Sequence, residues 1–329
     1  EIAQCLVGSE MCIRDSHSFM EVNPVLIKEY KKSTTLRRTK TDSVDCESIA
    51  RWLITVEYKP HSKGFYHAYS LKSLTRLRDR LIRQRSFYLV KITNVLDHTF
   101  PEFKPFFNER LSKTALYLLE NYGSAEKMAR MNSASYDKLR CISRGKFSIQ
   151  QFLRLKELAA NTVGVNNSIF DLELNTLLTL YKSLSDEINT LETEIIKLIE
   201  EVHPHYMSIP GIGPISSAVI YAEYGDISNF SNPGQMLAFA GIEPGINDSG
   251  TESHGGRMVK HGSSQLRYVL LNACLPLIRF DLTFATYYEK KRAEGKKHRV
   301  AITHVAKKLI RVIYALERQD VDFNAQKLR

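Results

Sequence analysis

The strongest constraint on the fold is a seven-residue repeat of apolar side chains between Ser168 and Val202. Two interleaved series carry the repeat: Leu177, Leu184, Leu191 and Leu198, and Tyr181, Ile188, Ile195 and Val202. Such a repeat, with charged residues between its members, is typical of an α-helix whose apolar seam packs on a second helix. The seam predicts a coiled coil, formed either with another copy of the chain or with a basic helix expected at residues 70–95. Pro204 ends the pattern.

Length and composition predict a hydrophobic core and a polyanionic partner. The chain has 329 residues, of which 43% are hydrophobic, so extended disorder is not expected. Its net charge is +10, which indicates nucleic acid before a membrane surface because no single amphipathic helix carries the charge. No apolar run is long enough to predict a transmembrane helix. The five cysteines form no CxxC pair, which favours a reducing compartment and no zinc site.

Residues 1–16 are set aside from the fold. The segment from Cys5 to Ser16 reads CLVGSEMCIRDS. It resembles the translation of a sequencing-library adapter, and a segment of that origin is excluded from structural reasoning. Position 1 is Glu rather than Met. We therefore expect the native protein to extend further at its N-terminus.

Two aspartates mark the start of a predicted helix in the N-terminal part of the chain. A strand is expected to end at Phe19 to Val22, and a helical pattern starts at Val25. Asp42 and Asp45 then open the stretch DSVDCESIARWL. Their spacing of three residues puts both carboxylates on one helix face, where they can share a hard divalent cation. The alternative, which spacing alone favours, is that Asp42 caps the helix and Asp45 interacts with the helix dipole.

Helices are also expected in the central part of the chain. Residues 70–95 form a basic helix whose charged face suits a phosphate backbone or simply stays solvated. Residues 111–165 read as short helices, and the glycines that join them are Gly123, Gly145 and Gly164.

The C-terminal part adds an apolar helix and a basic one. Residues 265–279 predict an apolar helix interrupted by Pro276, and residues 281–316 predict a basic helical stretch. Within that stretch, Lys296, Lys297 and Arg299 are candidate contacts to nucleic acid.

A glycine turn precedes the C-terminal helices. Gly211 and Gly213 lie in the segment IPGIGPISSAV, between two helical patterns. The pattern resembles a helix-hairpin-helix turn, in which glycines let the backbone approach a phosphate and amides of the next helix bind it. The alternative is a structural turn that never meets nucleic acid.

A glycine-rich stretch from Ala238 to Leu266 holds the candidate nucleophile. Ser249 lies between Asp248 and Gly250, and a hydroxyl in a turn before a glycine can stand clear of the backbone. Basic residues follow as candidate phosphate contacts: His254, Arg257 and Lys260, with Arg267 beyond them. The combination suits attack on a phosphate, and it equally suits an ordinary polar loop.

Several sequence blocks, in order, resemble the DEDD transposases of insertion sequences in the IS110 group. The N-terminal block is KTDSVDCESIA. The C-terminal blocks are IPGIGPISSAVIYAEYGD, FSNPGQMLAFAGIEPGINDSGT, GRMVKHGSSQLRYVLLNA and YYEKKRAEGKKHRVAITHVAKKLIRVIY. The resemblance covers about residues 19–318, and its C-terminal series is specific because four motifs keep their order.

The resemblance implies a two-part enzyme. Its N-terminal domain would have an RNase H or RuvC-like fold with Asp, Glu, Asp and Asp around Mg²⁺. Its C-terminal domain would carry a serine that attacks DNA and forms a covalent phosphoserine. A coiled coil would join them and drive assembly into a homo-oligomer, a dimer or tetramer, and a structured guide (bridge) RNA would pair with donor and target DNA.

The family's site residues carry over by position. Asp42 and Asp45 match the last two acidic residues, and Ser249 matches the serine. The family's glycine and lysine positions fall on Gly211, Gly213, Lys260 and Gly262. The first Asp and the Glu would precede residue 22, where this chain has adapter-like sequence, so we expect the chain as written to be inactive in recombination.

The expected fold is therefore mixed and mostly α. An RNase H/RuvC-like α/β remnant at 17–65 is followed by a helical linker with a coiled coil at 66–203. A C-terminal transposase domain with a helix-hairpin-helix and Ser249 spans 204–318, and a tail spans 319–329. The expected function is RNA-guided DNA transposition in the bacterial or archaeal cytoplasm, at the nucleoid. The alternatives are a non-catalytic DNA- or RNA-binding protein and a resolvase-like, structure-specific nuclease.

Overall fold

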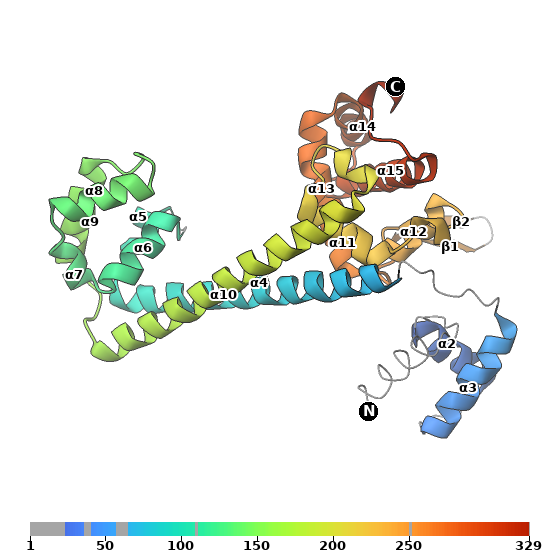
Figure 1. Cartoon of the computed structure of the whole chain (residues 1–329), viewed down its shortest axis with the longest axis horizontal. Helices are drawn as coiled ribbons and strands as arrows, with labels where there is room; N and C mark the ends of the chain where they lie inside the picture. Colours follow the sequence, from blue (N-terminus) through green and yellow to red (C-terminus); the bar gives the residue numbers. More distant parts are fainter. Residues whose placement is uncertain (1–23, 36–40, 57–64, 109–110, 250–251, 329) are drawn as a thin grey trace.

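The computed structural model describes residues 24–35, 41–56, 65–108, 111–249 and 252–328, and these are almost entirely helical. A long two-helix arm joins a cluster of short helices at one end to a C-terminal helical unit at the other (Figure 1). Two further helices near the N-terminus lie apart from the arm. The strand expected at residues 19–22 and the adapter-like segment at 1–16 lie outside the described residues.

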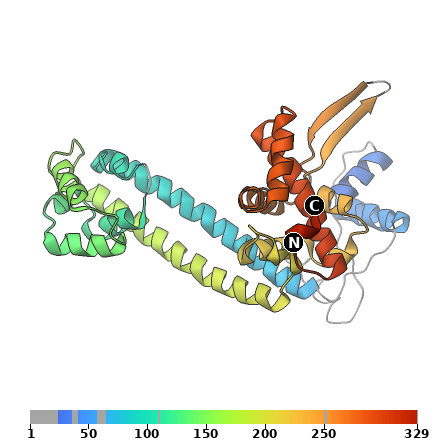
Figure 2. The ribbon, with the colours of Figure 1, turned by 90° about the horizontal axis from the view of Figure 1, so that it is seen from above.

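The arm consists of α4 (Phe65–Thr99) and α10 (Ser168–Val202), which run antiparallel along each other (Figures 1 and 2). Both helices are predicted correctly, and within the chain α10 folds on α4. The buried residues of α10 are Leu174, Leu178, Ile188, Ile195 and Ile199. The seam thus follows the series with Ile188, while the four leucines at 177, 184, 191 and 198 flank it, half-buried. An ion pair of 2.5 Å between Arg78 and Glu192 links the two helices. A coiled coil between copies of the chain stays a prediction.

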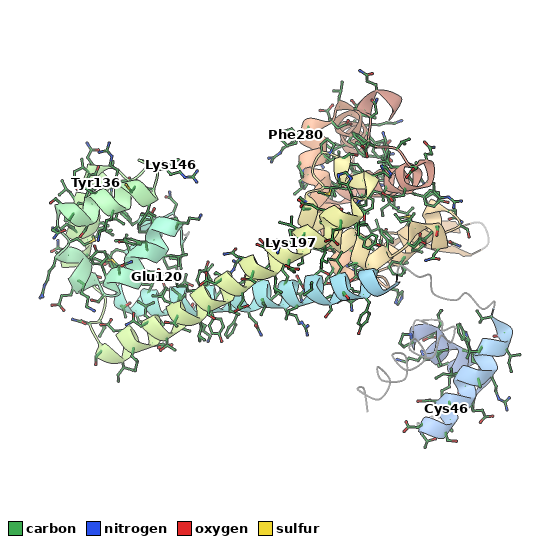
Figure 3. The ribbon with its side chains drawn as sticks, viewed as in Figure 1. Cys46, Glu120, Tyr136, Lys146, Lys197 and Phe280 are labelled. Carbon is green, nitrogen blue, oxygen red and sulfur yellow. The ribbon has the colours of Figure 1, made fainter. Side chains whose placement is uncertain are left out.

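Five short helices form the cluster at the far end of the arm (Figure 3), and the four within residues 111–165 agree with the sequence. They are α5 (Phe103–Phe106), α6 (Lys113–Tyr122), α7 (Ala125–Ala129), α8 (Ser133–Ile142) and α9 (Ile149–Ala160). The side chains of Ser112, Ser124, Asn132 and Ser148 cap the N-termini of α6 to α9 by accepting bonds from backbone N–H groups. Each cap satisfies a donor that a helix leaves unpaired. Their shared core closes on both arm helices, through Ile92 and Leu96 of α4 and Leu174 of α10.

The C-terminal unit is built around α15 (His298–Gln319), which has nine buried residues. Around it lie η1 (His205–Ser208), α11 (Pro214–Tyr224), η2 (Ile227–Asn229), α12 (Pro233–Ala240), α13 (Ser264–Phe280), α14 (Leu282–Ala293) and η3 (Ala325–Leu328). The expected basic stretch at 281–316 is two helices, because the chain turns at Gly295, whose φ is +77°. This positive φ suits glycine, which has no Cβ to clash there.

The prediction that Pro276 interrupts its helix is wrong. Helix α13 continues through Pro276 to Phe280. The proline ring faces Gly211, where an added Cβ would lie 2.7 Å from Pro276 Cγ and 2.9 Å from the Ala273 carbonyl oxygen. Because residue 211 has no side chain, the ring has room beside an unbroken helix.

A two-stranded antiparallel hairpin leaves the C-terminal unit between α12 and α13. Its strands are β1 (Pro244–Ser249) and β2 (Glu252–Met258). The register pairs Asn247 with His254 and closes on Ser249 opposite Glu252, with an irregularity near Pro244. Figure 2 shows the hairpin projecting away from the helices. The sequence left an ordinary polar loop as an alternative for this stretch, and its backbone instead forms paired strands.

The N-terminal helices are α2 (Pro24–Thr34) and α3 (Asp42–Thr55), and none of the residues of α3 is buried. Lys31 of α2 forms an ion pair of 2.5 Å with Asp45 of α3.

No described helix alone has the length and apolar composition to cross a membrane; only α13 and α14 together, bent by 106°, pass such a test. Both helices contribute buried residues to the C-terminal core, including Leu270 and Phe284, as core helices do.

Candidate active site and nucleic-acid surfaces

Backbone bonds fix the hairpin where it meets the helices. The Val259 N–H donates to the Glu243 carbonyl oxygen at 2.8 Å, which continues the pairing past the last strand residues. The Ser263 N–H donates to the Phe239 carbonyl oxygen at 3.3 Å, which joins the start of α13 to the end of α12. The hairpin is therefore held at its base, through the residues that flank both strands.

A close backbone contact reinforces this attachment, which we call the hairpin base: Ala240, Gly241, Gly262 and Arg267. A Cβ added at Gly262 would lie 2.0 Å from the Phe239 carbonyl oxygen and 2.5 Å from the Gly241 nitrogen. Gly241 ends α12 with a φ of +64°. The Arg267 guanidinium donates to the Ala240 carbonyl oxygen at 3.2 Å. Gly262 is thus a position where only glycine fits without moving backbone.

Ser249 is the last residue of β1, three positions before β2 begins at Glu252. Arg257 lies on β2, next to the base, and Lys260 is exposed just after it. The side chains of residues 244–257 lie outside the described part of the structure. Backbone pairing shows that Ser249 and Arg257 stand at opposite ends of the hairpin, so the structure does not bring them together.

The two aspartates occupy the first turn of α3, and the expected cap is corrected. Thr41, not Asp42, caps the helix, because its hydroxyl accepts a bond from the Val44 N–H. Asp42 is exposed, while the Asp45 carboxylate is engaged by the Lys31 ammonium. Among the described residues, no three His, Cys, Asp or Glu side chains are grouped as a metal ion would need. Carboxylate oxygens are ligands that Mg²⁺ prefers. Asp42 and Asp45 therefore have suitable ligand atoms, but two side chains are too few to surround the ion.

The glycine turn has two different glycines. Gly211 has a φ of +98° and packs on α13 at Pro276, which is sufficient structural reason for glycine. Gly213 is the N-terminal cap residue of α11 and has no heavy atom within 4 Å of an added Cβ. The turn follows the 3₁₀ turn η1 rather than an α-helix. A helix-hairpin-helix that contacts phosphate therefore stays a prediction.

Basic side chains gather where α14 gives way to α15. Lys296, Lys297 and Arg299 are all exposed there, and their contact with nucleic acid stays a prediction. The local field is positive: the pKa of His304 is lowered, first by burial and then by Lys307 and the neighbouring lysines of α14 and the turn. Such a surface attracts a phosphate backbone.

Arg267, proposed from sequence as a nucleic-acid contact, is partly buried in the hairpin base. Its guanidinium donates to the Ala240 carbonyl oxygen and so links α13 to the end of α12. A contact to nucleic acid stays a prediction for this residue.

The sequence did not indicate a cleft of about 940 Å³ between α4, α11 and the adjoining ends of α12 and α13. Its walls include Lys72, Arg76, Arg80 and Arg83 of α4, together with Phe239. The only signal was the spacing of three or four residues between the α4 cations, which places them on one helix face. Nothing local could indicate that Phe239 lies opposite them.

Comparison with known proteins matches both ends of the chain to transposase families. A sequence model described as "Transposase IS116/IS110/IS902 family" matches residues 204–289, and a DEDD transposase model of the IS110 group matches residues 11–101.

Three relatives illustrate the similarity. An uncharacterized 43.6 kDa protein of insertion element IS110 from Streptomyces coelicolor is 27% identical over 72% of this chain and 60% of its own length. The transposase for insertion sequence element IS1111A of Coxiella burnetii is 25% identical over 78% of this chain and 59% of its own. A pilin gene-inverting protein of Moraxella bovis is 27% identical over 43% of this chain and 46% of its own. The chain thus spans about 60% of the length of the first two proteins. With two family models matched in order along it, the chain belongs to the IS116/IS110/IS902 family of insertion-sequence transposases.

Proposed function

We propose that this chain is part of a DNA recombinase that cuts and rejoins strands through a covalent bond to Ser249. The observation that carries the proposal is the attachment of the hairpin. It presents Ser249 at the closing pair of two strands whose other ends are fixed to α12 and α13. A nucleophile gains most from a position that is held in advance, because orientation need not then be established during the reaction.

The proposed step exchanges one phosphodiester bond for another. Ser249 Oγ attacks the phosphorus and forms a new P–O bond, while the bond from phosphorus to a sugar oxygen breaks. The serine proton passes to solvent or a base, and the released sugar oxygen takes up a proton. Attack by a sugar hydroxyl of another strand then rejoins the DNA and releases the serine. A serine hydroxyl is a weak nucleophile, so the step needs activation and charge neutralisation.

Two groups of the chain are proposed to contact the DNA and the metal ion. Arg257 and Lys260 lie near the hairpin base, where they would hold the phosphate backbone at the opposite end of the hairpin from Ser249. Asp42 and Asp45 would contribute oxygen ligands to Mg²⁺, which when bound neutralises charge on a phosphate. For this, Asp45 must separate from Lys31.

The proposed macromolecular partners follow from charge and from family resemblance. The exposed cations at the junction of α14 and α15, with Lys296, Lys297 and Arg299, would contact donor and target DNA or a guide RNA. Pairing by a guide RNA and assembly of copies into a dimer or tetramer through α4 and α10 complete the proposal. Location in the cytoplasm, at the nucleoid, stays part of it.

The test is to trap the protein–DNA adduct with the full-length protein from an intact element, using a DNA substrate nicked near the junction. Native protein is expected to give a DNA-linked band on a denaturing gel. Ser249→Ala should give none, and Ser263→Ala serves as the control. Asp42→Asn, Asp45→Asn and removal of Mg²⁺ by a chelator should each weaken the band.

Two alternatives predict different results. Adduct that survives Ser249→Ala would move the nucleophile elsewhere, with Ser263 and Ser264 next. Metal-dependent cutting of branched DNA by Ser249→Ala, without any adduct, would favour a resolvase-like nuclease. Binding with neither cutting nor adduct would favour a non-catalytic nucleic-acid-binding protein.

A further inference from the structure

We propose that the cleft between α4 and the α11–α13 face binds a single strand of nucleic acid. In this proposal Lys72 and Arg80 contact its phosphates, and an unpaired base stacks on Phe239. The inference rests on the proposed function, since it adds to a recombinase the place where a strand is held next to the hairpin.

The cleft walls come from parts of the chain that are far apart in sequence. One wall is the first half of α4, and the other combines the end of α11, the end of α12 and the first residues of α13. With a volume of about 940 Å³, the hollow falls in the upper part of the range of ligand sites in proteins. The elements that line it meet where the arm joins the C-terminal unit (Figure 1).

The acids of the cleft are mostly neutralised within the protein, which leaves cations available. Glu223 is buried, with 1% of its side chain exposed, and accepts two bonds from Arg76, at 2.9 and 3.2 Å. Asp79 accepts bonds from Arg83, at 2.8 Å, and from the amide of Gln265.

Lys72 and Arg80 remain after these pairs are counted. Neither has an acidic partner in the part of the chain that the structure describes, and both line the cleft. The remaining acid, Asp226, is exposed and accepts a bond from the Ser228 N–H. Unpaired cations on one face of a concave surface are the arrangement that tracks a phosphate backbone.

Exposed aromatic rings in the same hollow favour a single strand over a duplex. Phe239 is 41% exposed and packs beside the rings of Tyr224 and Phe230, each 5.7 Å away between centroids, at interplanar angles of 35° and 79°. Tyr69, 46% exposed, lies across the cleft on α4. A ring that is packed in place and still exposed is a platform for an unpaired base. Bases in a duplex are stacked on one another and cannot occupy it.

The cleft ends at the hairpin base. Phe239 and Ser263 line the cleft, and these are the residues whose backbone bond joins α12 to α13. Gly262, packed on the Phe239 carbonyl, ends the connection from the hairpin. A strand in the cleft would therefore emerge beside the element that carries Ser249.

The test measures binding by the 329-residue chain of two fluorescein-labelled probes, a 12-nucleotide oligo-dT and a 12-nucleotide oligo-U RNA, by fluorescence anisotropy. The variant Lys72→Ala/Arg80→Ala removes the two free cations. Its matched control, Arg85→Ala/Lys91→Ala, removes the same charge from α4 outside the cleft. Because Phe239 has ring neighbours, Phe239→Leu accompanies Phe239→Ala, and Phe87→Ala, an exposed ring on the arm, is their control. Thermal melting checks that each variant is folded.

We expect Lys72→Ala/Arg80→Ala to weaken binding about tenfold and to reduce the slope of log affinity against log salt by about 1.4, since each phosphate contact to a single strand contributes about 0.7. Phe239→Ala should weaken binding about tenfold with the salt slope unchanged, since stacking on an aromatic ring contributes about 1–3 kcal/mol per base. Phe239→Leu should show the same direction. A preference for one probe would identify the strand as DNA or RNA.

Three results would overturn the inference: equal effects of the cleft and control double variants, no binding of either probe by the native chain, or tighter binding of a 12-base-pair duplex that Phe239→Ala leaves unchanged. The assay involves no strand cutting. Its failure would leave the adduct experiment on Ser249 intact, and failure of the adduct experiment would leave this result standing.

Discussion

The two regions that carry the proposed chemistry differ in how they are held. The hairpin with Ser249 grows from a unit whose core includes nine buried residues of α15 alone, and its base is fixed by backbone contacts at Gly262. Helix α3, which carries Asp42 and Asp45, has no buried residue. Its described tie to α2 includes the ion pair of Asp45 with Lys31.

The two halves of the proposed site therefore depend on different contacts for their position. The serine end is positioned by its own folding unit. The aspartate end has an apolar side, with Ile49 at 42% and Leu53 at 43% exposed, which the described residues leave uncovered. Three pairs of substitutions and one pH comparison test how the parts of the chain are held.

The largest expected effect is the loss of core packing in the C-terminal unit. Leu309→Ala removes a fully buried side chain of α15 and should lower the free energy of unfolding by about 3 kcal/mol. Leu53→Ala, on the exposed side of α3, should change it by less than about 0.5 kcal/mol. Urea denaturation followed by circular dichroism measures both. Similar losses would remove the contrast between the regions.

The next effect tests the hairpin base. Gly262→Ala forces a Cβ against the Phe239 carbonyl oxygen and the Gly241 nitrogen, so unfolding should become easier by about 2–3 kcal/mol. Gly213→Ala, where an added Cβ meets nothing within 4 Å, is the matched control and should have little effect. If Gly262→Ala were as stable as the control, the base would not be a rigid attachment.

A smaller effect concerns the ion pair that joins the arm to the C-terminal unit. Arg76→Ala leaves the buried Glu223 carboxylate without its guanidinium partner, at a cost of about 2 kcal/mol. Adding Glu223→Gln removes the unpaired charge and should recover part of the loss. A double variant less stable than Arg76→Ala would show that Glu223 has another partner. Urea midpoints of the two variants decide this.

The smallest effect is a pH dependence in the C-terminal tail. His205 contacts Asp322 and Asp320, each at 2.9 Å, and these carboxylates raise its pKa. Because the pKa of His205 in the folded protein lies above its ordinary value, these contacts contribute fully to the free energy of unfolding below about pH 6.5. That contribution is lost as the pH rises through the folded pKa. The urea midpoint of native protein should therefore exceed that of His205→Asn at pH 6 and approach it at pH 8.5. A difference that grows with pH would contradict the assignment.

The sequence predicts what depends on periodicity and fails where distant residues decide. The repeat through Ile188 and Ile195 predicts α10, because the residues on the buried face of a helix recur at a regular spacing in the sequence. Pro276 misleads, because the residue that gives its ring room, Gly211, belongs to another segment. The expected N-terminal cap of α3, Asp42, is wrong by one position, since the preceding residue, Thr41, is also of a type that caps helices.

The candidate site was predicted unevenly for the same reason. Ser249 is proposed from its neighbours and from family resemblance, but the sequence does not predict its hairpin, since PGINDS and ESHGGRM contain few residues that favour strands. The pairing is set by anchors outside both strands, at Glu243 and Gly262. The sequence does not predict the cleft, because Lys72 and Phe239 line the same hollow only when α4 packs beside the C-terminal unit.

The most direct test of the central claim is mass spectrometry of the trapped protein–DNA adduct after digestion with protease and nuclease. We expect a nucleotide joined through phosphate to the peptide that contains Ser249, with the peptide containing Ser263 and Ser264 unmodified. A nucleotide on any other residue, with the Ser249 peptide recovered unmodified, would contradict it.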